Sequence, residues 1–356
     1  MDFTALITDW YHSNKRALPW RETRDPYLIW VSEIILQQTR VNQGLDYYLR
    51  FVKTFPDVKS LANADEQDVL SIWKGLGYYS RARNMHTAAK IVMESMNGVF
   101  PSAYKQLITL KGIGKYTAAA IASICSGEKQ AVVDGNVIRV FSRVFGYREP
   151  ADSTQLYNKI RLKSTALMEL QYIDSGTYNQ AVMEFGALWC KPKNPLCDLC
   201  IFREECFAFK NSMTEMLPTP KADVKRRKRW LNYLVVIQND SFLMQKRSTG
   251  DIWAGLWEFP CVEARKLFSA EEMATESEIR FGSSIFPKLI AYEKDFRHLL
   301  THREIHARFF ICKISDNKHI PAYEPAEFIP FNSLNALPVS RLVEGFIQKS
   351  GLIPGH

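Results

Sequence analysis

LKGIGKYTAAAI, residues 110–121, places two glycines in front of an apolar, alanine-rich run that is typical of a helix. Gly112 and Gly114 permit a positive φ and the close approach of another backbone. A helix beginning near Lys115 has free N–H groups in its first turn, and these point back at the glycines. We therefore expect either an amide site for one phosphate or a plain tight turn between two packed helices.

The composition of the chain is that of a basic globular protein. Its 356 residues are enough for two domains, 46% of them are apolar, and the net charge is +8. A basic balance is compatible with nucleic acid, although many basic proteins bind none. No segment approaches the roughly 20 apolar residues that span a bilayer, and the N-terminus lacks the pattern of a secretory signal. We therefore expect no membrane partner and a cytoplasmic location, associated with the nucleoid if the source is bacterial.

The apolar spacing changes once along the chain. Up to residue 207 apolar residues recur mostly at helical intervals. Residues 208–229 contain two prolines and end in the basic run KRRKR (225–229). This composition predicts a linker, which is either a solvated tether or a DNA contact. We expect an all-α domain over residues 1–207.

The part beyond the linker, residues 230–356, has a different pattern. β-Branched alternation over residues 230–247, interrupted by Asn239-Asp240, predicts a β-hairpin. Residues 307–314 predict another strand, and residues 340–349 a helix. This part should form a smaller α+β domain.

A second motif, VVDGNVIRVFSR (132–143), places Asp134 directly before a helical pattern. An aspartate in this position is usually a helix N-cap. A carboxylate held by amide donors stays ionised near neutral pH, so capping is compatible with a catalytic role.

A third motif, PWRETRDPYLIWVSEIILQQTR (19–40), contains a helix start at Asp25-Pro26. Glu33 falls within this helix among aromatic and apolar neighbours, which raise the pKa of a carboxyl group and suit a general acid. The alternative is a glutamate on a solvated helix face. The helix ends with amide and hydroxyl side chains of the kind that read DNA base edges: Gln37, Gln38 and Thr39.

Four of the seven cysteines crowd into one loop, with the spacing C-x6-C-x2-C-x5-C. Such crowding favours metal ligation in a reducing compartment over disulfides. Structural zinc usually shows two short knuckles, and here there is only one CxxC. The spacing therefore favours a [4Fe–4S] cluster over zinc, with these ligands: Cys190, Cys197, Cys200 and Cys206.

Together these motifs resemble those of the adenine DNA glycosylases, the MutY family of the helix-hairpin-helix superfamily. The resemblance is carried by PWR-TRDPY-IWVSEI-LQQT, GLGYYSRARN, G-G-YTA, VDGNV and the cysteine loop, and it covers nearly the whole chain. Beyond residue 230 the segment GDIWAGLWEFP resembles the Nudix-like C-terminal domain of the same family. No REXXEE-type helix follows it, so pyrophosphate hydrolysis is not expected.

The resemblance implies that a monomer hydrolyses the N-glycosidic bond of adenine mispaired with 8-oxoguanine or guanine in double-stranded DNA. Glu33 matches the general acid that protonates adenine, and Asp134 matches the carboxylate that stabilises the oxocarbenium-like sugar. Tyr116 and Asn136 match residues that position this machinery. Further positions match residues near the extruded adenine, Arg21 and Gln180, or residues that enter or line the duplex around 8-oxoguanine: Gln38, Thr39, Leu76 and Tyr78.

The C-terminal domain is implied to recognise 8-oxoguanine. Family members use a Phe-Ser-His loop for this contact, and this chain has Leu300-Thr301-His302 in its place. Thr301 retains a hydroxyl group that can hydrogen-bond to the lesion, whereas the leucine replaces an aromatic side chain.

Lys115 bears on two alternative functions. Endonuclease III-like relatives, which also cut the DNA strand, carry a lysine two residues after the second glycine, where this chain has Tyr116. Lys115 is one residue early, about 100° away around the helix. We therefore expect Lys115 to face phosphate rather than to act as a nucleophile. The alternatives are a bifunctional glycosylase/lyase of the endonuclease III type and a non-catalytic DNA-binding iron–sulfur protein.

Overall fold

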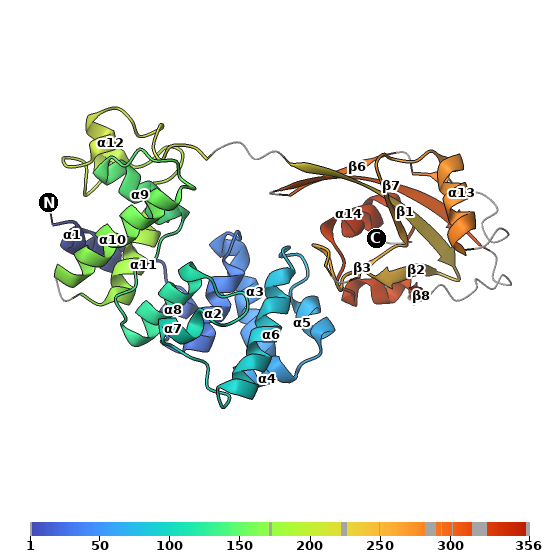
Figure 1. Cartoon of the computed structure of the whole chain (residues 1–356), viewed down its shortest axis with the longest axis horizontal. Helices are drawn as coiled ribbons and strands as arrows, with labels where there is room; N and C mark the ends of the chain where they lie inside the picture. Colours follow the sequence, from blue (N-terminus) through green and yellow to red (C-terminus); the bar gives the residue numbers. More distant parts are fainter. Residues whose placement is uncertain are drawn as a thin grey trace. The chain divides into compact units, whose positions relative to one another are not determined.

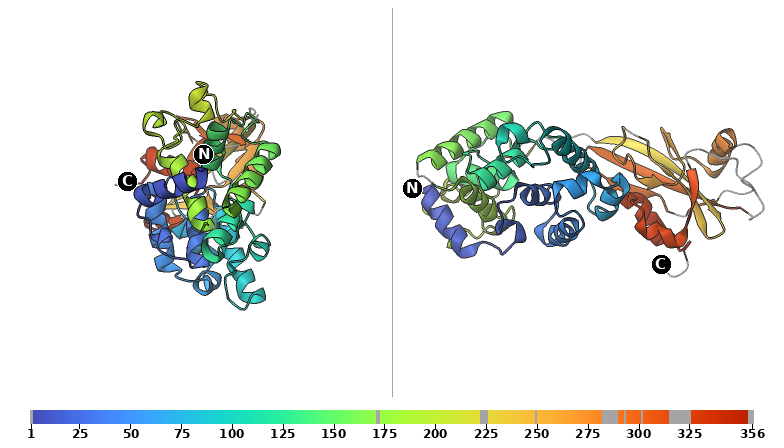
Figure 2. Two further views of the ribbon diagram at one scale, coloured as in Figure 1. Left: turned by 90° about the vertical axis from the view of Figure 1, so that its left-hand side faces the viewer. Right: turned by 90° about the horizontal axis from the view of Figure 1, so that it is seen from below.

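The structure, a computed structural model, describes residues 2–170, 173–221, 226–248, 250–281, 290–292, 294–300, 302–314 and 326–353 (Figures 1 and 2). It divides into two compact units, which are Met1–Ala64 with Asn84–Asp223, and Asp65–Arg83 with Val224–His356. Among the described residues, no helix combines the length and the apolar character needed to cross a membrane.

The first unit is helical, and its described residues contain no strand, as predicted. Asp25 caps α2 by accepting hydrogen bonds from the N–H groups of Tyr27 and Leu28, and Pro26 follows at the first helical position. The elements are α1 (Phe3–Asn14), η1 (Pro19–Arg21), α2 (Pro26–Ile35), α3 (Val41–Thr54), α4 (Val58–Asn63), α6 (Ser80–Ser95), α7 (Tyr104–Leu107), α8 (Lys115–Ser126), α9 (Gly135–Phe145), α10 (Thr154–Leu170), α11 (Ser175–Leu188), η2 (Cys197–Leu199) and α12 (Phe207–Lys210). The first four residues of α6 belong to the second unit.

The core of this unit forms where α1, α9 and α11 meet. Phe3 is buried among Phe141, Tyr178 and Phe202, with its ring centroid 4.8 Å from that of Phe202. Such aromatic contacts bury large apolar areas with defined geometry. The packing holds α9 and α11 together, and both helices contribute to the cavity described below.

The second unit contains a mixed β-sheet, so the predicted α+β class is confirmed. Among the described strands, β1 and β7 run parallel, and the other pairs are antiparallel. The elements are α5 (Glu66–Ile72), β1 (Arg227–Gln238), β2 (Ser241–Lys246), β3 (Trp257–Glu258), β4 (Cys261–Ala264), α13 (Ala270–Phe281), β5 (Ile290–Ala291), β6 (Phe296–Leu299), β7 (Arg303–Lys313), β8 (Ala326–Pro330), η3 (Phe331–Ala336) and α14 (Arg341–Ser350).

Helices cover both faces of this sheet. Phe310 of β7 packs in a cluster with Met273 of α13, whereas its neighbour Phe309 stacks on Phe346 of α14 with ring centroids 3.9 Å apart. Successive strand residues point to opposite faces, which explains why adjacent phenylalanines serve different helices.

The predicted hairpin, the strand near residues 307–314 and the last helix are all present. Asn239 and Asp240 have φ angles of 46° and 52°, which match a two-residue hairpin turn between β1 and β2. The domain limits 1–207, 208–229 and 230–356 stay a prediction. The basic run differs from expectation, because its residues from Arg227 onward form the start of β1 rather than a tether.

Candidate active site

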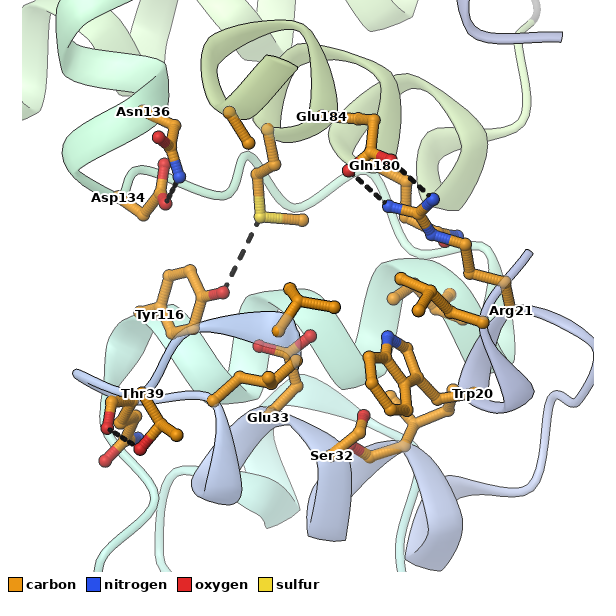
Figure 3. Close-up of a pocket in the computed structure, with 18 of the residues that line it drawn as sticks. Trp20, Arg21, Ser32, Glu33, Thr39, Tyr116, Asp134, Asn136, Gln180 and Glu184 are labelled. Atoms are coloured by element: carbon orange, nitrogen blue, oxygen red, sulfur yellow. Dashed lines mark hydrogen bonds and ion pairs between the residues drawn. The ribbon is translucent and has the colours of Figure 1, made fainter. Parts of the chain in front are cut away.

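A cavity of about 500 Å³ lies in the helical unit, with walls from η1, α2, α8, the start of α9, and α11 (Figure 3). This volume suits a small organic ligand. Most of the residues predicted to act on adenine or DNA line it: Arg21, Glu33, Gln38, Thr39, Tyr116, Asp134, Asn136 and Gln180.

Glu33 lies in the middle of α2 and is 9% exposed. The helix is buried along most of its length, so the alternative of a solvated face is wrong. Burial raises the pKa of Glu33 to about 7; the Tyr116 hydroxyl lowers it, the charge of Asp134 raises it, and Arg21 lowers it. A carboxyl group with such a pKa is about half protonated at neutral pH and suits a general acid.

Asp134 is both the N-cap of α9 and part of the cavity wall. Its Oδ1 accepts a hydrogen bond from the Val137 N–H at 2.8 Å, and its Oδ2 accepts one from Asn136 Nδ2 at 2.8 Å. Burial raises the pKa of Asp134, while these donors and the charge of Arg139 oppose the rise. The donors stabilise the ionised form, which is the form that can stabilise positive charge in the cavity.

The helix-hairpin-helix turn joins α7 to α8 and supplies Tyr116. Gly112 has a φ of 80°, and a Cβ there would come within 2.6 Å of the Asn84 Cβ, so this position requires glycine. Gly114 differs from expectation: as N-cap of α8 it has a φ of −90°, and no atom would lie within 4 Å of an added Cβ. The space beside Gly114 is open, and the phosphate site expected at this turn stays a prediction.

Tyr116 lies in the cavity wall, whereas its neighbour Lys115 does not. Tyr116 lines the cavity, and its hydroxyl donates to the Met183 thioether at 3.6 Å. Burial raises the pKa of Tyr116 well above the usual value, so the hydroxyl keeps its proton. Lys115 is exposed and is not among the residues that line this cavity. The geometry therefore agrees with the expectation that Lys115 is not the nucleophile.

Arg139 was not singled out in the sequence, yet it holds Asn136 in place. Its Nη2 donates to Asn136 Oδ1 at 2.8 Å and to the Gly186 carbonyl at 2.7 Å, and its Nε donates to the Cys190 carbonyl at 2.7 Å. Hydrogen bonds therefore run from the cysteine loop through Arg139 and Asn136 to Asp134. Gly186 makes this possible, because a Cβ there would lie 2.7 Å from the Asn136 Cβ.

Glu184 is a second residue that the sequence reasoning missed. It is 2% exposed and forms ion pairs with Arg16 at 2.6 Å and with Arg21 at 2.7 Å. Figure 3 shows Glu184 beside Arg21. Burial alone would raise its pKa, but the two guanidinium groups lower it to about 2. Glu184 follows Gln180 by one helical turn on the cavity face of α11, and this spacing was the signal available in the sequence.

Gln180 is oriented by a neighbour on α1. The Tyr11 hydroxyl donates to Gln180 Oε1 at 3.1 Å. With one lone pair of Oε1 engaged, Gln180 can offer its amide N–H groups and the second lone pair of that oxygen to a ligand. The chain therefore supplies a hydrogen-bond donor at this wall of the cavity.

Other predicted DNA contacts lie outside this cavity. Leu76 is 7% exposed, whereas Tyr78 is 46% exposed and has a φ of 49°. A side chain with the exposure of Tyr78 can reach a ligand, and its predicted contact with the duplex around 8-oxoguanine stays a prediction. Thr301 lies outside the described residues, and His302 is exposed at the turn between β6 and β7.

The four loop cysteines provide a donor set that fits a metal cluster. Burial raises the pKa of Cys197 and Cys200, and the charge of Cys190 raises both further. The Phe202 N–H donates to Cys200 Sγ at 3.4 Å. Four neighbouring thiolates repel one another unless a metal centre binds them. Within the described ranges, no three potential ligands are already gathered in a metal-binding arrangement.

Comparison with known proteins identifies the class first. Residues 31–164 match the model of the HhH-GPD superfamily of base excision DNA repair proteins, and residues 232–349 match the NUDIX domain. A solved thermostable thymine-DNA glycosylase is similar to 59% of this chain and 95% of that one, with 27% identity and a TM-score of 0.54. The fold and site thus define a DNA-binding glycosylase, a hydrolase of base excision repair, with a C-terminal Nudix-like domain.

Two curated relatives narrow the class. The adenine DNA glycosylase of Buchnera aphidicola subsp. Schizaphis graminum is 34% identical over 84% of this chain and 85% of its own length. The human adenine DNA glycosylase is 38% identical over 60% of this chain and 41% of its own length. The chain belongs to the adenine DNA glycosylase family. It is accordingly a monofunctional glycosylase, and neither the lyase nor the non-catalytic alternative is supported.

Proposed function

We propose that the protein hydrolyses the N-glycosidic bond of adenine mispaired with 8-oxoguanine or guanine in double-stranded DNA. The observation that carries this proposal is the meeting of two carboxyl groups in one cavity, where the pKa of Glu33 is raised to about 7. Glycosidic hydrolysis uses one carboxyl group as the general acid and a second to stabilise the positive charge on the sugar. The base and the mispair follow from the names of the relatives and from the motif resemblance.

The two carboxyl groups divide the reaction between them. Adenine leaves the base stack and enters the cavity, where the Glu33 proton is transferred to a nitrogen of its imidazole ring. The bond to the sugar C1′ then breaks, and its electron pair leaves with neutral adenine. The Asp134 carboxylate stabilises the positive charge on the sugar. Water adds its hydroxyl oxygen to C1′, and the proton it releases restores Glu33.

The remaining cavity residues are proposed to hold the two carboxyl groups and the adenine base in position. Asn136 donates to Asp134, and Arg139 fixes Asn136. On the α11 side, Glu184 fixes Arg21, so this guanidinium is held in one orientation by an ion pair. Fixed donors cost little reorganisation when a ligand enters, which favours both binding and rate.

The test is adenine release from a defined 8-oxoguanine:A duplex. Glu33→Gln removes the proton donor while keeping the side-chain shape, and we expect single-turnover release to fall by about 10²- to 10⁴-fold. Glu169→Gln is the matched control, because Glu169 is exposed on α10 and outside the cavity. If the wild-type protein releases no adenine, the proposed function is wrong. If Glu33→Gln cleaves like the control, Glu33 is not the acid.

The four cysteines are proposed to hold a [4Fe–4S] cluster. Their sulfurs supply the required thiolate ligands, and Arg143 Nη1 lies 3.5 Å from Cys190 Sγ, where it can balance negative charge. A bound cluster would cross-link the loop, whose Cys190 carbonyl accepts the bond from Arg139. Thiolate ligands require a reducing compartment, which supports a cytoplasmic location.

The Nudix-like domain is proposed to read 8-oxoguanine through the loop at residues 300–302. This assignment comes from the motif resemblance. The exposure of His302 at the turn between β6 and β7 supports it, because such a position can reach a bound duplex.

A further inference from the structure

The turn at residues 75–79, with the sequence GLGYY, has an unusual backbone. Gly75, Gly77 and Tyr78 have φ angles of 89°, 73° and 49°. Glycine adopts positive φ angles readily, whereas tyrosine does so rarely and at a cost in free energy. Such a conformation persists only where the surrounding structure holds it. The Tyr78 side chain is 46% exposed, so the turn presents an aromatic ring at the surface.

Residues on either side of the turn hold its centre. Trp73 Nε1 and Arg81 Nη2 donate hydrogen bonds to the Gly77 carbonyl at 3.1 and 3.2 Å. The Arg81 guanidinium also lies 5.8 Å from the centroid of the Tyr78 ring, within the range of a cation–π contact. The two hydrogen bonds fix the peptide group that joins Gly77 to Tyr78.

A second set of bonds comes from residues 334–341, which precede and begin α14. The Tyr79 hydroxyl donates to the Val339 carbonyl at 3.1 Å and accepts a hydrogen bond from the Gly75 N–H at 3.4 Å. Arg341 Nη2, 266 residues away in sequence, donates to the Gly75 carbonyl. Both backbone groups of Gly75 are thus engaged, and all these residues belong to the second compact unit.

Residues 334–341 are themselves attached to the β-sheet. The Trp257 N–H, in β3, donates to the Pro338 carbonyl at 2.9 Å, and Trp257 also forms a β-bridge with Val339. Two more side chains near the turn donate to carbonyls of this segment: Ser71 to Ala336 at 3.1 Å and Lys74 to Leu334 at 3.3 Å. The turn is therefore connected to the sheet rather than to a free loop.

We propose that Arg341 is a positioning residue which, with the Tyr79 hydroxyl, holds the turn in the conformation that places the Tyr78 ring between bases of the duplex. A ring already in position loses less conformational freedom on binding than one on a mobile turn. Insertion between base steps unstacks them, and the energy of binding must offset that cost. Arg341 favours insertion through Gly75 and needs no contact with DNA. The inference rests on the proposed function and on the predicted contact of Tyr78 with the duplex.

The experiment follows insertion separately from catalysis. The full chain is bound to a duplex in which 8-oxoguanine lies opposite 2′-fluoro-2′-deoxyadenosine, whose fluorine disfavours a positively charged sugar and so prevents base release. 2-Aminopurine, placed on one side of 8-oxoguanine or on the other in two duplexes, reports unstacking by its fluorescence. The readout is the Tyr78-dependent change, defined as the difference between the wild type and Tyr78→Ala. Duplex affinity is measured on the same samples.

Two substitutions of Arg341 separate its donor from its bulk. Because one hydrogen bond shifts an equilibrium by about two- to tenfold, we expect Arg341→Met to weaken duplex binding by that factor and to lose most of the Tyr78-dependent change. Arg341→Lys keeps a donor and should retain most of both. In the Tyr78→Ala background, Arg341→Met should change affinity little, because both residues act through one turn. The matched control, Arg265→Met, replaces another exposed arginine of the same unit and should behave as the wild type.

The outcomes separate the inference from the proposed function. A loss in Arg341→Met that depends on Tyr78, and that Arg341→Lys recovers, supports the positioning role. Values equal to the control overturn it, as do an affinity loss that persists undiminished in Tyr78→Ala and a wild type without any Tyr78-dependent change. If Arg341→Met fails to fold, as judged by thermal melting, Tyr79→Phe decides the question in the same assay. Absence of adenine release from an ordinary 8-oxoguanine:A duplex would overturn the proposed function and leave these binding measurements valid.

Discussion

The pH dependence of adenine release tests the raised pKa of Glu33 directly. The general acid must carry its proton, so activity should fall as pH rises through the pKa of about 7. For one group with that pKa, about nine tenths of the molecules are protonated at pH 6 and about one tenth at pH 8. We therefore expect kcat/KM on an 8-oxoguanine:A duplex to decline about tenfold between these values. kcat/KM is the appropriate quantity, because it reports the groups of the free enzyme.

A substitution at Tyr116 should shift this pH profile in a defined direction. The Tyr116 hydroxyl lowers the pKa of Glu33, so Tyr116→Phe should move the descending limb of the profile to higher pH. Tyr157→Phe, outside the cavity on α10, should leave the limb in place. A profile that is flat between pH 6 and 8, or a shift to lower pH in Tyr116→Phe, would refute the assignment of Glu33 as a buried acid.

Three further predictions concern other parts of the molecule. Borohydride reduction during turnover should trap little protein–DNA adduct; efficient trapping that Lys115→Ala abolishes would contradict the monofunctional assignment. Purified protein should contain about four irons per chain, as a [4Fe–4S] site requires, and colourless protein with one zinc would refute that cluster. Gly186→Ala should lower single-turnover release by forcing Asn136 away from Asp134, whereas Gly345→Ala, with no atom near the added Cβ, should have no such effect.

A last prediction concerns lesion preference. Thr301→Ala with His302→Ala should reduce the preference for 8-oxoguanine:A over G:A by several-fold, since one lost hydrogen bond is worth about 0.5 to 1.5 kcal/mol. Comparing release rates on the two duplexes measures this ratio. An unchanged ratio would show that residues elsewhere read the lesion.

Features that depend on nearby residues were readable from the sequence alone. Asp25 and Asp134 cap helices through N–H groups two or three residues away, and the Asn239-Asp240 turn closes between adjacent strands. The cysteine spacing is likewise a property of one short loop. Such features are encoded locally, because the interacting groups are neighbours in every conformation of the chain.

Features that join distant segments were decided only by the tertiary structure. Glu184 binds Arg21 across 163 residues of sequence, and no local pattern marks that pair. Helix α2 is buried along most of its length, and this depends on helices from elsewhere in the chain. The resulting burial of Glu33 raises the pKa of its carboxyl group. The basic run reads as a linker in the sequence, yet its residues from Arg227 onward pair with β7 through backbone hydrogen bonds that any side chains can accompany. Long-range packing and desolvation therefore determined the chemistry of the site, whereas local hydrogen bonding determined where its parts begin and end.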